Sequence, residues 1–199
     1  MGVEIEVKAW VDDEKGLKEK LDGAANYLGA YVKEDSYWQP SDNAEKYRGV
    51  FKSGIRIRKE NWERPQIEPP NDNTSFIKVC YKNKEVRNGI EVNDEREFDI
   101  TNQAIFEDFL KNLGFEVDIY KTKQGWAWDY DGITVELSMV SGLGWFIELE
   151  ILSENRDNFQ SVQNSLITTL ESIGIKKSSI EGRYYTEMLR ALKAGKFRR

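Results

Sequence analysis

The sequence predicts an α+β protein, mainly antiparallel β, in which an eight-stranded sheet closes into a tunnel-like barrel with flanking helices. Alternating apolar and polar residues recur in eight or nine short segments. Several of these segments are joined by glycine-containing turns such as Asp131-Gly132, which favour hairpins over parallel crossovers. Charged residues also repeat along the polar faces of the segments. We therefore expect one domain over residues 1–199, with a basic tail at 193–199 that frays.

Periodicity and turn chemistry place the individual elements. Strands are predicted over residues 3–11, 31–38, 51–59, 76–82, 90–100, 115–121, 127–130, 133–140 and 145–151. Helices are predicted over residues 12–28, between a Thr101 cap and Gly114, and over 157–173. Gln124-Gly125 is interpreted as a turn between two of the strands. Residues 60–74 contain three prolines and are expected to form a long loop or flap.

Composition excludes several kinds of chemistry. The chain has no histidine and a single cysteine, Cys80, which excludes Ser-His-Asp and Cys-His catalysis, an intrachain disulfide and a multi-cysteine zinc site. No apolar run approaches the roughly 20 residues of a membrane span, and the first residues lack the pattern of a signal peptide. A net charge of −6 argues against a general nucleic-acid binder. We expect a cytoplasmic protein with no membrane or nucleic-acid partner.

Charged residues share a face on six of the predicted strands, because residues two apart in a strand point the same way. They are Glu4, Glu6 and Lys8; Arg56 and Arg58; Lys78 and Lys82 with Cys80 between them; Glu95, Glu97 and Asp99; Glu136 with Ser138; and Glu148 and Glu150. One such face is commonly the solvent side of a sheet. Six of them turned inward would give a charged lumen that suits a triphosphate bound with Mg²⁺ or Mn²⁺.

Several motifs occur in the order typical of one family. They are Glu4-x-Glu6-x-Lys8, Asp35-Ser36-Tyr37-Trp38, Arg56-Ile57-Arg58, Val79-Cys80-Tyr81-Lys82, Leu113-Gly114-Phe115, Lys121-x-Lys123 and residues 142–150, followed by a closing helix over 183–192. Together they resemble the CYTH, or triphosphate tunnel metalloenzyme, superfamily. That superfamily includes class IV adenylyl cyclases, thiamine triphosphatases and inorganic triphosphatases. The resemblance implies an eight-stranded antiparallel tunnel in a single CYTH-like domain.

The resemblance also implies roles for individual residues. The implied substrate-binding residues are Lys8, Arg56, Arg58, Lys78, Lys82, Lys121 and Lys123, of which Lys8, Arg56, Arg58 and Lys82 are the catalytic candidates. The implied ligands of Mg²⁺ or Mn²⁺ are Glu4, Glu6, Glu136, Glu148 and Glu150. Two positions depart from the family pattern. Ser138 stands where many members have a metal-binding aspartate, so Glu136 is the candidate replacement, and Glu95 stands in place of an arginine.

Three functions stay open at this point. The first is a class IV adenylyl cyclase-like lyase that converts ATP to cyclic AMP and pyrophosphate, which the chain length and residues 183–192 favour. The second is a triphosphatase acting on tripolyphosphate, a nucleoside triphosphate or thiamine triphosphate. The third is a non-catalytic receptor for a nucleotide or polyphosphate, which the Ser138 and Glu95 departures favour. A homodimer is left open.

Overall fold

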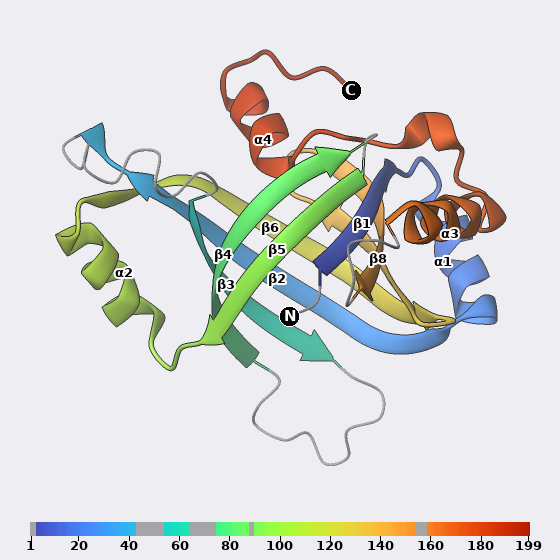
Figure 1. Ribbon diagram of the computed structural model, residues 1–199, viewed down its shortest axis with the longest axis horizontal. Helices are drawn as coiled ribbons and strands as arrows, with labels where there is room; N and C mark the ends of the chain where they lie inside the picture. Colours follow the sequence, from blue (N-terminus) through green and yellow to red (C-terminus); the bar gives the residue numbers. More distant parts are fainter. Residues whose placement is uncertain (1–2, 43–53, 64–74, 88–89, 154–158) are drawn as a thin grey trace.

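The computed structural model describes residues 3–42, 54–63, 75–87, 90–153 and 159–199, with the backbone alone described at 3, 82–87, 91–95 and 153. Eight strands form the body of the molecule (Figure 1). They are β1 (Val3–Trp10), β2 (Asn26–Pro40), β3 (Ile55–Glu63), β4 (Ser75–Arg87), β5 (Ile90–Asp99), β6 (Phe115–Tyr130), β7 (Ile133–Val140) and β8 (Gly144–Ser153). The predicted antiparallel eight-stranded sheet with flanking helices is confirmed.

The strands are hydrogen-bonded in the order β1-β5-β4-β3-β2-β6-β7-β8, which is that of a closed barrel. β1 pairs with β8 over its whole length, from Val3 opposite Ser153 to Trp10 opposite Phe146. On its other side it pairs with β5 over a shorter register, from Glu4 opposite Asn93 to Glu6 opposite Glu91. The first strand therefore lies between two strands from distant parts of the chain.

Four α-helices lie outside the sheet in the described residues: α1 (Glu14–Ala24), α2 (Gln103–Asn112), α3 (Phe159–Ser172) and α4 (Tyr185–Lys193), with a short 3-10 turn at Lys177–Ser179. α1 and α3 lie together at one end, and α2 lies at the opposite end (Figure 1). No helix in the described part of the chain is long and apolar enough to span a bilayer.

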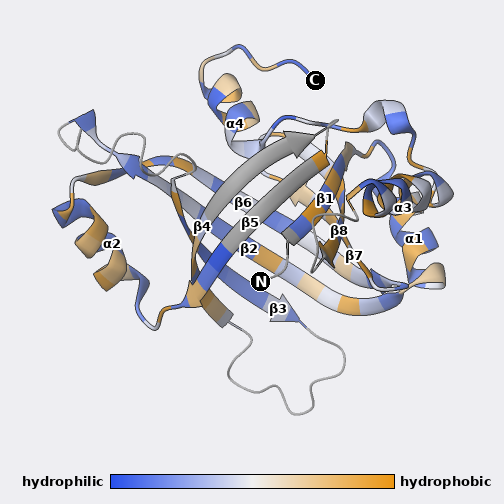
Figure 2. Cartoon of the chain, viewed as in Figure 1, coloured by the Kyte–Doolittle hydropathy of each residue, from blue (hydrophilic) through white to orange (hydrophobic). Residues whose placement is uncertain are grey.

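The hydrophobic core lies between the helices and the outer face of the sheet. Leu21 of α1 and Leu166 and Leu170 of α3 are fully buried in one cluster with Val7 and Leu149 of the adjacent strands. The strands alternate between hydrophobic and hydrophilic residues (Figure 2). Because the apolar residues of β1 and β8 face the helices, the alternate charged residues of these strands face the barrel interior.

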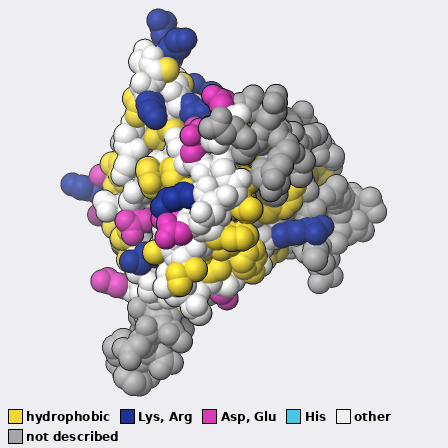
Figure 3. Space-filling view, turned by 90° about the vertical axis from the view of Figure 1, so that its left-hand side faces the viewer, with side chains coloured by type: hydrophobic (Ala, Val, Ile, Leu, Met, Phe, Trp, Pro, Cys, Tyr) yellow, Lys and Arg dark blue, Asp and Glu magenta, His cyan; other side chains and the backbone are white. Residues whose placement is uncertain are grey.

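A second cluster lies under α2. Leu110 of this helix packs with Trp38, Ile57 and Val79 of three neighbouring strands. The other face of α2 is apolar and exposed, and Ile105 is 69% exposed. Figure 3 shows hydrophobic side chains gathered on this side of the molecule.

Two predicted breaks in the strands are wrong. Gln124-Gly125 lies within the continuous strand β6 and is not a turn. Gly125 instead allows a close approach, since a Cβ at this position would lie 2.1 Å from the Leu137 carbonyl oxygen of β7. Residues 60–63, which were assigned to the proline-rich loop, form the end of β3. The rest of that loop, 64–74, lies outside the described residues, as do residues 51–53 of the predicted third strand.

Two predicted helix ends are also wrong. The first helix ends at Ala24, because Asn26 already pairs with Asp129 in the β2–β6 ladder, whose long-range pairing outweighs the local helical pattern. The cap of α2 is Asn102 and not Thr101, since the Asn102 side chain accepts a hydrogen bond from the Ile105 amide. The turn predicted at Asp131-Gly132 is confirmed, and both residues have positive φ angles, 53° and 82°.

Candidate functional site

A charged cavity of about 300 Å³ lies among the inner faces of the strands, with the N-terminal end of α4 as part of its lining. The lining residues are Glu4, Glu6, Lys33, Tyr37, Arg56, Arg58, Glu60, Lys78, Glu97, Lys121, Lys123, Thr134, Glu136, Glu148, Glu150, Tyr184, Tyr185 and Thr186. Its charges are unevenly distributed. The lining cations come from β2, β3, β4 and β6, which form a cationic wall that also contains Glu60, whereas β1 and β8 contribute only acids to the lining, Glu4, Glu6, Glu148 and Glu150, which form an acidic wall. Glu97 of β5 and Glu136 of β7 lie between these walls in the strand order.

Strand register explains why these side chains meet. Directly opposite residues of neighbouring strands point to the same face. Asp35 of β2 lies opposite Lys121 of β6 on one side and Arg58 of β3 on the other, and Arg58 lies opposite Lys78 of β4. One layer of the cavity is therefore built from four strands that are far apart in the sequence.

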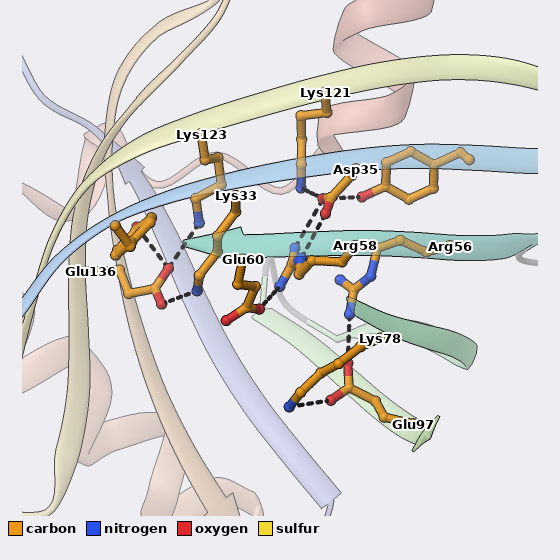
Figure 4. A network of polar contacts seen from close by, with 12 residues as sticks. Lys33, Asp35, Arg56, Arg58, Glu60, Lys78, Glu97, Lys121, Lys123 and Glu136 are labelled. Atoms are coloured by element: carbon orange, nitrogen blue, oxygen red, sulfur yellow. Dashed lines mark hydrogen bonds and ion pairs between the residues drawn. The ribbon is translucent and has the colours of Figure 1, made fainter. Parts of the chain in front are cut away.

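Asp35 is the centre of the first charged group (Figure 4). Its Oδ1 accepts a hydrogen bond from Arg58 Nε at 2.6 Å and its Oδ2 accepts one from Arg58 Nη2 at 2.9 Å. Lys121 Nζ lies 2.8 Å from Oδ2, and Tyr37 Oη donates to the same oxygen at 3.3 Å. Burial alone would raise the pKa of Asp35, but Arg58 and then Lys121 hold it well below its usual value. The carboxylate is thus ionised and aligns two cations.

Glu136 and Lys123 form the second group (Figure 4). Lys123 Nζ lies 3.0 Å from Glu136 Oε2 and also pairs with Glu148 of β8. Lys33 pairs with the other oxygen of Glu136, and Tyr31 Oη donates to Glu136 at 2.9 Å.

The charges of this second group stabilise one another. Burial opposes ionisation of Glu136, but Lys33 and Lys123 hold its pKa well below the usual value. Burial likewise opposes ionisation of Glu148, whose pKa Lys123 lowers to about 2. Glu148 in turn raises the pKa of the buried Lys123 well above its usual value. All three groups are therefore charged at neutral pH.

Glu97 of β5 forms the third group. Arg56 Nη2 lies 2.8 Å from Glu97 Oε1, and Lys78 Nζ lies 3.4 Å from Glu97 Oε2 (Figure 4). A further carboxylate, Glu60, lies 3.6 Å from Arg58 Nη1. Glu97 thus pairs with both Arg56 and Lys78, where β3, β4 and β5 line the cavity.

The acidic wall supplies the oxygen donors that suit a hard divalent cation. Glu6 of β1 lies directly opposite Glu150 of β8 on the cavity face, and like charges in this arrangement repel unless a cation reduces the repulsion. Among the described residues no three acidic, cysteine or histidine side chains come close enough to form a metal site by themselves. The donor set nevertheless fits Mg²⁺, which uses one or two carboxylates together with water and substrate phosphates.

The structure brings most of the expected site residues to one cavity. Those that line it are Glu4, Glu6, Arg56, Arg58, Lys78, Lys121, Lys123, Glu136, Glu148 and Glu150. Lys8 is fully buried beside the cavity, with its Nζ 4.7 Å from the centre of the Tyr185 ring. The side chains of Lys82 and Glu95 lie outside the described residues. Ser138 is fully buried, and its Oγ has no hydrogen-bond partner in the described part of the chain.

Sequence reasoning missed other members of the cavity, notably Lys33, Glu60 and Tyr185. Lys33 could have been found, because it shares a strand face with Asp35 and Tyr37, which the motif comparison had already singled out. Tyr185 lies in the closing helix that the motif comparison singled out, but nothing in that motif assigned it to the cavity. It reaches the cavity from a helix, and only the packing of α4 against the barrel places it there.

The fold and this cavity define the protein as an antiparallel β-barrel with a charged interior divided into cationic and acidic walls. Residues 2–185 match the model of the CYTH domain, and the chain belongs to this family. The family resemblance predicted from the motifs is therefore confirmed. It places the chain in a superfamily of adenylyl cyclase-like and triphosphatase enzymes, whose triphosphate tunnel members depend on metal ions.

Individual proteins are similar to this chain over most of its length. A protein of Methanocaldococcus jannaschii named "Putative adenylate cyclase" is 24% identical over 94% of this chain and 98% of its own length. A protein of Pyrococcus horikoshii has a similar structure, with a TM-score of 0.78, 24% identity, and coverage of 94% of this chain and 98% of its own. A Hippeastrum protein described as a "putative adenylyl cyclase" with a dominant triphosphatase activity has a TM-score of 0.61, 13% identity, and coverage of 100% and 98%.

Proposed function

We propose that the protein is a metal-dependent enzyme that acts on a triphosphate in its charged cavity, with class IV adenylyl cyclase-like conversion of ATP to cyclic AMP and pyrophosphate as its reaction. The observation that supports this most is the division of the cavity into a cationic wall and an acidic wall. Arginine and lysine bind phosphoryl oxygens, and carboxylates bind the accompanying cation. A metal-bound triphosphate complements both walls at once.

The cationic wall would orient the phosphate chain and stabilise the charge that develops on it. In the cyclase reaction the ribose 3′-oxygen attacks the α-phosphorus in line, and the bond to the bridging oxygen breaks to release pyrophosphate. Arg56, Arg58 and Lys82 are proposed to stabilise that leaving group, with Lys8, Lys78, Lys121 and Lys123 as further phosphate contacts. Asp35 holds Arg58 and Lys121 in position.

The acidic wall would hold the cation. Glu4, Glu6, Glu148 and Glu150 are the proposed ligands of Mg²⁺ or Mn²⁺, with Glu136 as the substitute for the residue that Ser138 replaces. A bound cation would supply charge neutralisation and lower the pKa of the attacking hydroxyl. Glu6 and Glu150 lie directly opposite each other on the cavity face, where one cation could contact both carboxylates.

A triphosphatase is the second candidate, in which water attacks the terminal phosphorus of tripolyphosphate, a nucleoside triphosphate or thiamine triphosphate. The Hippeastrum protein supports this alternative, because it carries a cyclase name and is described as mainly a triphosphatase. Its likeness to this chain is one of fold. A non-catalytic receptor is the third candidate, which the neutral Ser138 in the acidic half of the barrel favours.

Phosphorus NMR separates the three candidates. The protein is incubated with ATP, and separately with tripolyphosphate, in the presence of Mg²⁺ or Mn²⁺. Cyclic AMP together with pyrophosphate identifies the cyclase, and orthophosphate identifies the triphosphatase. Broadening of the ligand resonances without products identifies the receptor. Unchanged spectra with both ligands would contradict the proposal in all its forms.

The metal assignment has its own test. The double substitution Glu148→Gln and Glu150→Gln should abolish metal-dependent turnover, at least 10²-fold, because it removes two anionic ligands while keeping side-chain size. The matched control is Glu116→Gln with Glu171→Gln, which removes the same charge from exposed positions. Full activity of the first double variant would refute these two residues as ligands. Circular dichroism checks that both variants remain folded.

A further inference from the structure

Helix α4 enters the cavity by its N-terminal end. Tyr184, Tyr185 and Thr186 all line the cavity, and the first helical hydrogen bond runs from the Met188 amide to the Tyr184 carbonyl. The first amides of a helix have no partner within the helix, and the aligned peptide dipoles make this end positive. The Tyr184 amide already donates to Glu187 Oε2 at 2.9 Å, and the following amides are the ones that would favour an anion in the cavity.

The Tyr185 hydroxyl is a second feature at the same place. The residue is only 8% exposed, and its Oη makes no hydrogen bond within the described part of the chain. A buried hydroxyl without a partner costs about 1–3 kcal/mol, so a ligand atom at this position would be stabilised. A tyrosine hydroxyl is protonated at neutral pH and is able to donate.

The surroundings of the Tyr185 ring favour an anion as that ligand. Lys8, Lys121 and Lys123 place their Nζ atoms 4.7, 5.1 and 5.8 Å from the ring centre. Two acids, Glu148 and Glu6, also act electrostatically on Tyr185, and Glu148 is paired with Lys123. An anionic group that accepts from the hydroxyl would thus lie near three ammonium groups and the end of a helix.

We propose that Tyr185 and the N-terminus of α4 form an anion subsite that receives one end of the phosphate chain, its terminal phosphoryl group. This inference rests on the proposed function, since it names an additional contact for the same class of ligand. The N-terminal end of α4 lines one side of the cavity and would bind the terminal phosphoryl group. The lysine and arginine side chains of the strands would bind the rest of the phosphate chain. Tyr185 is then a substrate-binding residue as well as part of the packing of α4.

Isothermal titration calorimetry with tripolyphosphate and Mg²⁺ tests the subsite. Tyr185→Phe removes only the hydroxyl and should raise Kd about tenfold, the loss expected for one hydrogen bond to a charged group. The control is Tyr120→Phe, which removes a hydroxyl from a residue that is 73% exposed on the barrel, and should leave Kd unchanged. An unchanged Kd for Tyr185→Phe with normal binding by the parent protein overturns the subsite alone. Absence of binding by the parent protein overturns both the subsite and the proposed function.

A second measurement keeps the test valid if Tyr185→Phe fails to fold. A 3-fluorotyrosine introduced at position 185 retains the hydroxyl, and its ¹⁹F resonance reports on the surroundings of the ring. Addition of tripolyphosphate with Mg²⁺ should shift this resonance, whereas adenosine, which lacks phosphate, should not. A resonance that is unaffected by saturating tripolyphosphate overturns the subsite.

Discussion

At the scale of single residues, Asp35 shows how one buried acid organises a binding wall. Its side chain is fully buried, and it contacts both Arg58 and Lys121 directly. Such a group is stable only because its charge is matched by cations and hydrogen bonds. Arg58 and Lys121, which it holds, both line the cavity.

Substitution of Asp35 should therefore be costly. We expect Asp35→Asn to lower the free energy of unfolding by about 3–5 kcal/mol, because it leaves two buried cations without their anion. The matched control is Asp108→Asn on α2, where the side chain is 71% exposed and pairs with Lys111. That change should cost less than about 1 kcal/mol. Urea unfolding measures both, and equal losses would contradict the role of Asp35.

Removal of the Glu97 charge is predicted to strengthen ligand binding, whereas removal of the Asp35 charge is predicted to weaken the fold. It occupies Arg56 and Lys78, two cations that a phosphate would also contact. We expect Glu97→Gln to tighten the binding of tripolyphosphate severalfold, corresponding to about 0.5–1 kcal/mol for a partly exposed pair. Calorimetry measures the change.

The control for Glu97 is Asp99→Asn. Asp99 is an exposed acid on the same strand face, so its removal changes the net charge equally, and it has no ion pair with Arg56 or Lys78 in the contacts described. Equal tightening in both variants would indicate a general charge effect. Weaker binding by Glu97→Gln would show that Glu97 assists the ligand instead of competing with it.

At the scale of elements, local alternation of apolar and polar residues predicts where strands form, whereas pairing with neighbouring strands determines where they end. β6 was expected as two strands and is one strand of 16 residues, because β2 pairs with it on both sides of Gly125 and β7 pairs with it from Lys123 to Tyr130. α1 ends earlier than its apolar pattern for the same reason. Alternation predicts which face a residue occupies, but the end of an element depends on partners elsewhere in the chain.

A crowded glycine in β6, Gly125, and an uncrowded one in α1, Gly23, are predicted to respond oppositely to alanine substitution. Gly125→Ala should destabilise the protein by more than about 2 kcal/mol, because the new Cβ would overlap the Leu137 carbonyl oxygen at 2.1 Å. Gly23→Ala in α1 meets no atom within 4 Å and should stabilise the protein by about 0.5–1 kcal/mol. Thermal unfolding followed by circular dichroism distinguishes them, and a neutral Gly125→Ala would contradict the close approach of β6 to β7.

At the scale of the whole molecule, the barrel brings both signs of charge into one space. The lining cations all come from residues 33–123, whereas the acidic wall comes from β1 and β8, which are distant in the sequence and paired in the barrel. Several carboxylates in this space keep pKa values below those of an unfolded chain. The stability of the fold should therefore depend on acid pH.

The sign of that dependence follows from Glu148. Its pKa is lowered from 4.5 to about 2, so its stabilising contribution is complete above pH 4.5 and is lost as the pH falls toward 2. The lowered pKa values of Asp35 and Glu136 act in the same direction. Urea midpoints measured between pH 7 and pH 2 should fall mainly below pH 4.5. A constant midpoint down to pH 3 would contradict the buried ion pairs.

The sequence by itself determined the antiparallel class, the inward faces of the charged strands and the family, because strand alternation and short motifs are local properties. It also identified most of the acids and bases of the cavity. Tertiary structure decided which of them meet. Asp35 contacts Lys121 and Lys123 contacts Glu148 only through the register of strands distant in sequence, and Tyr185 reaches the cavity only through the packing of α4. Such long-range contacts depend on the whole core, which no local pattern contains.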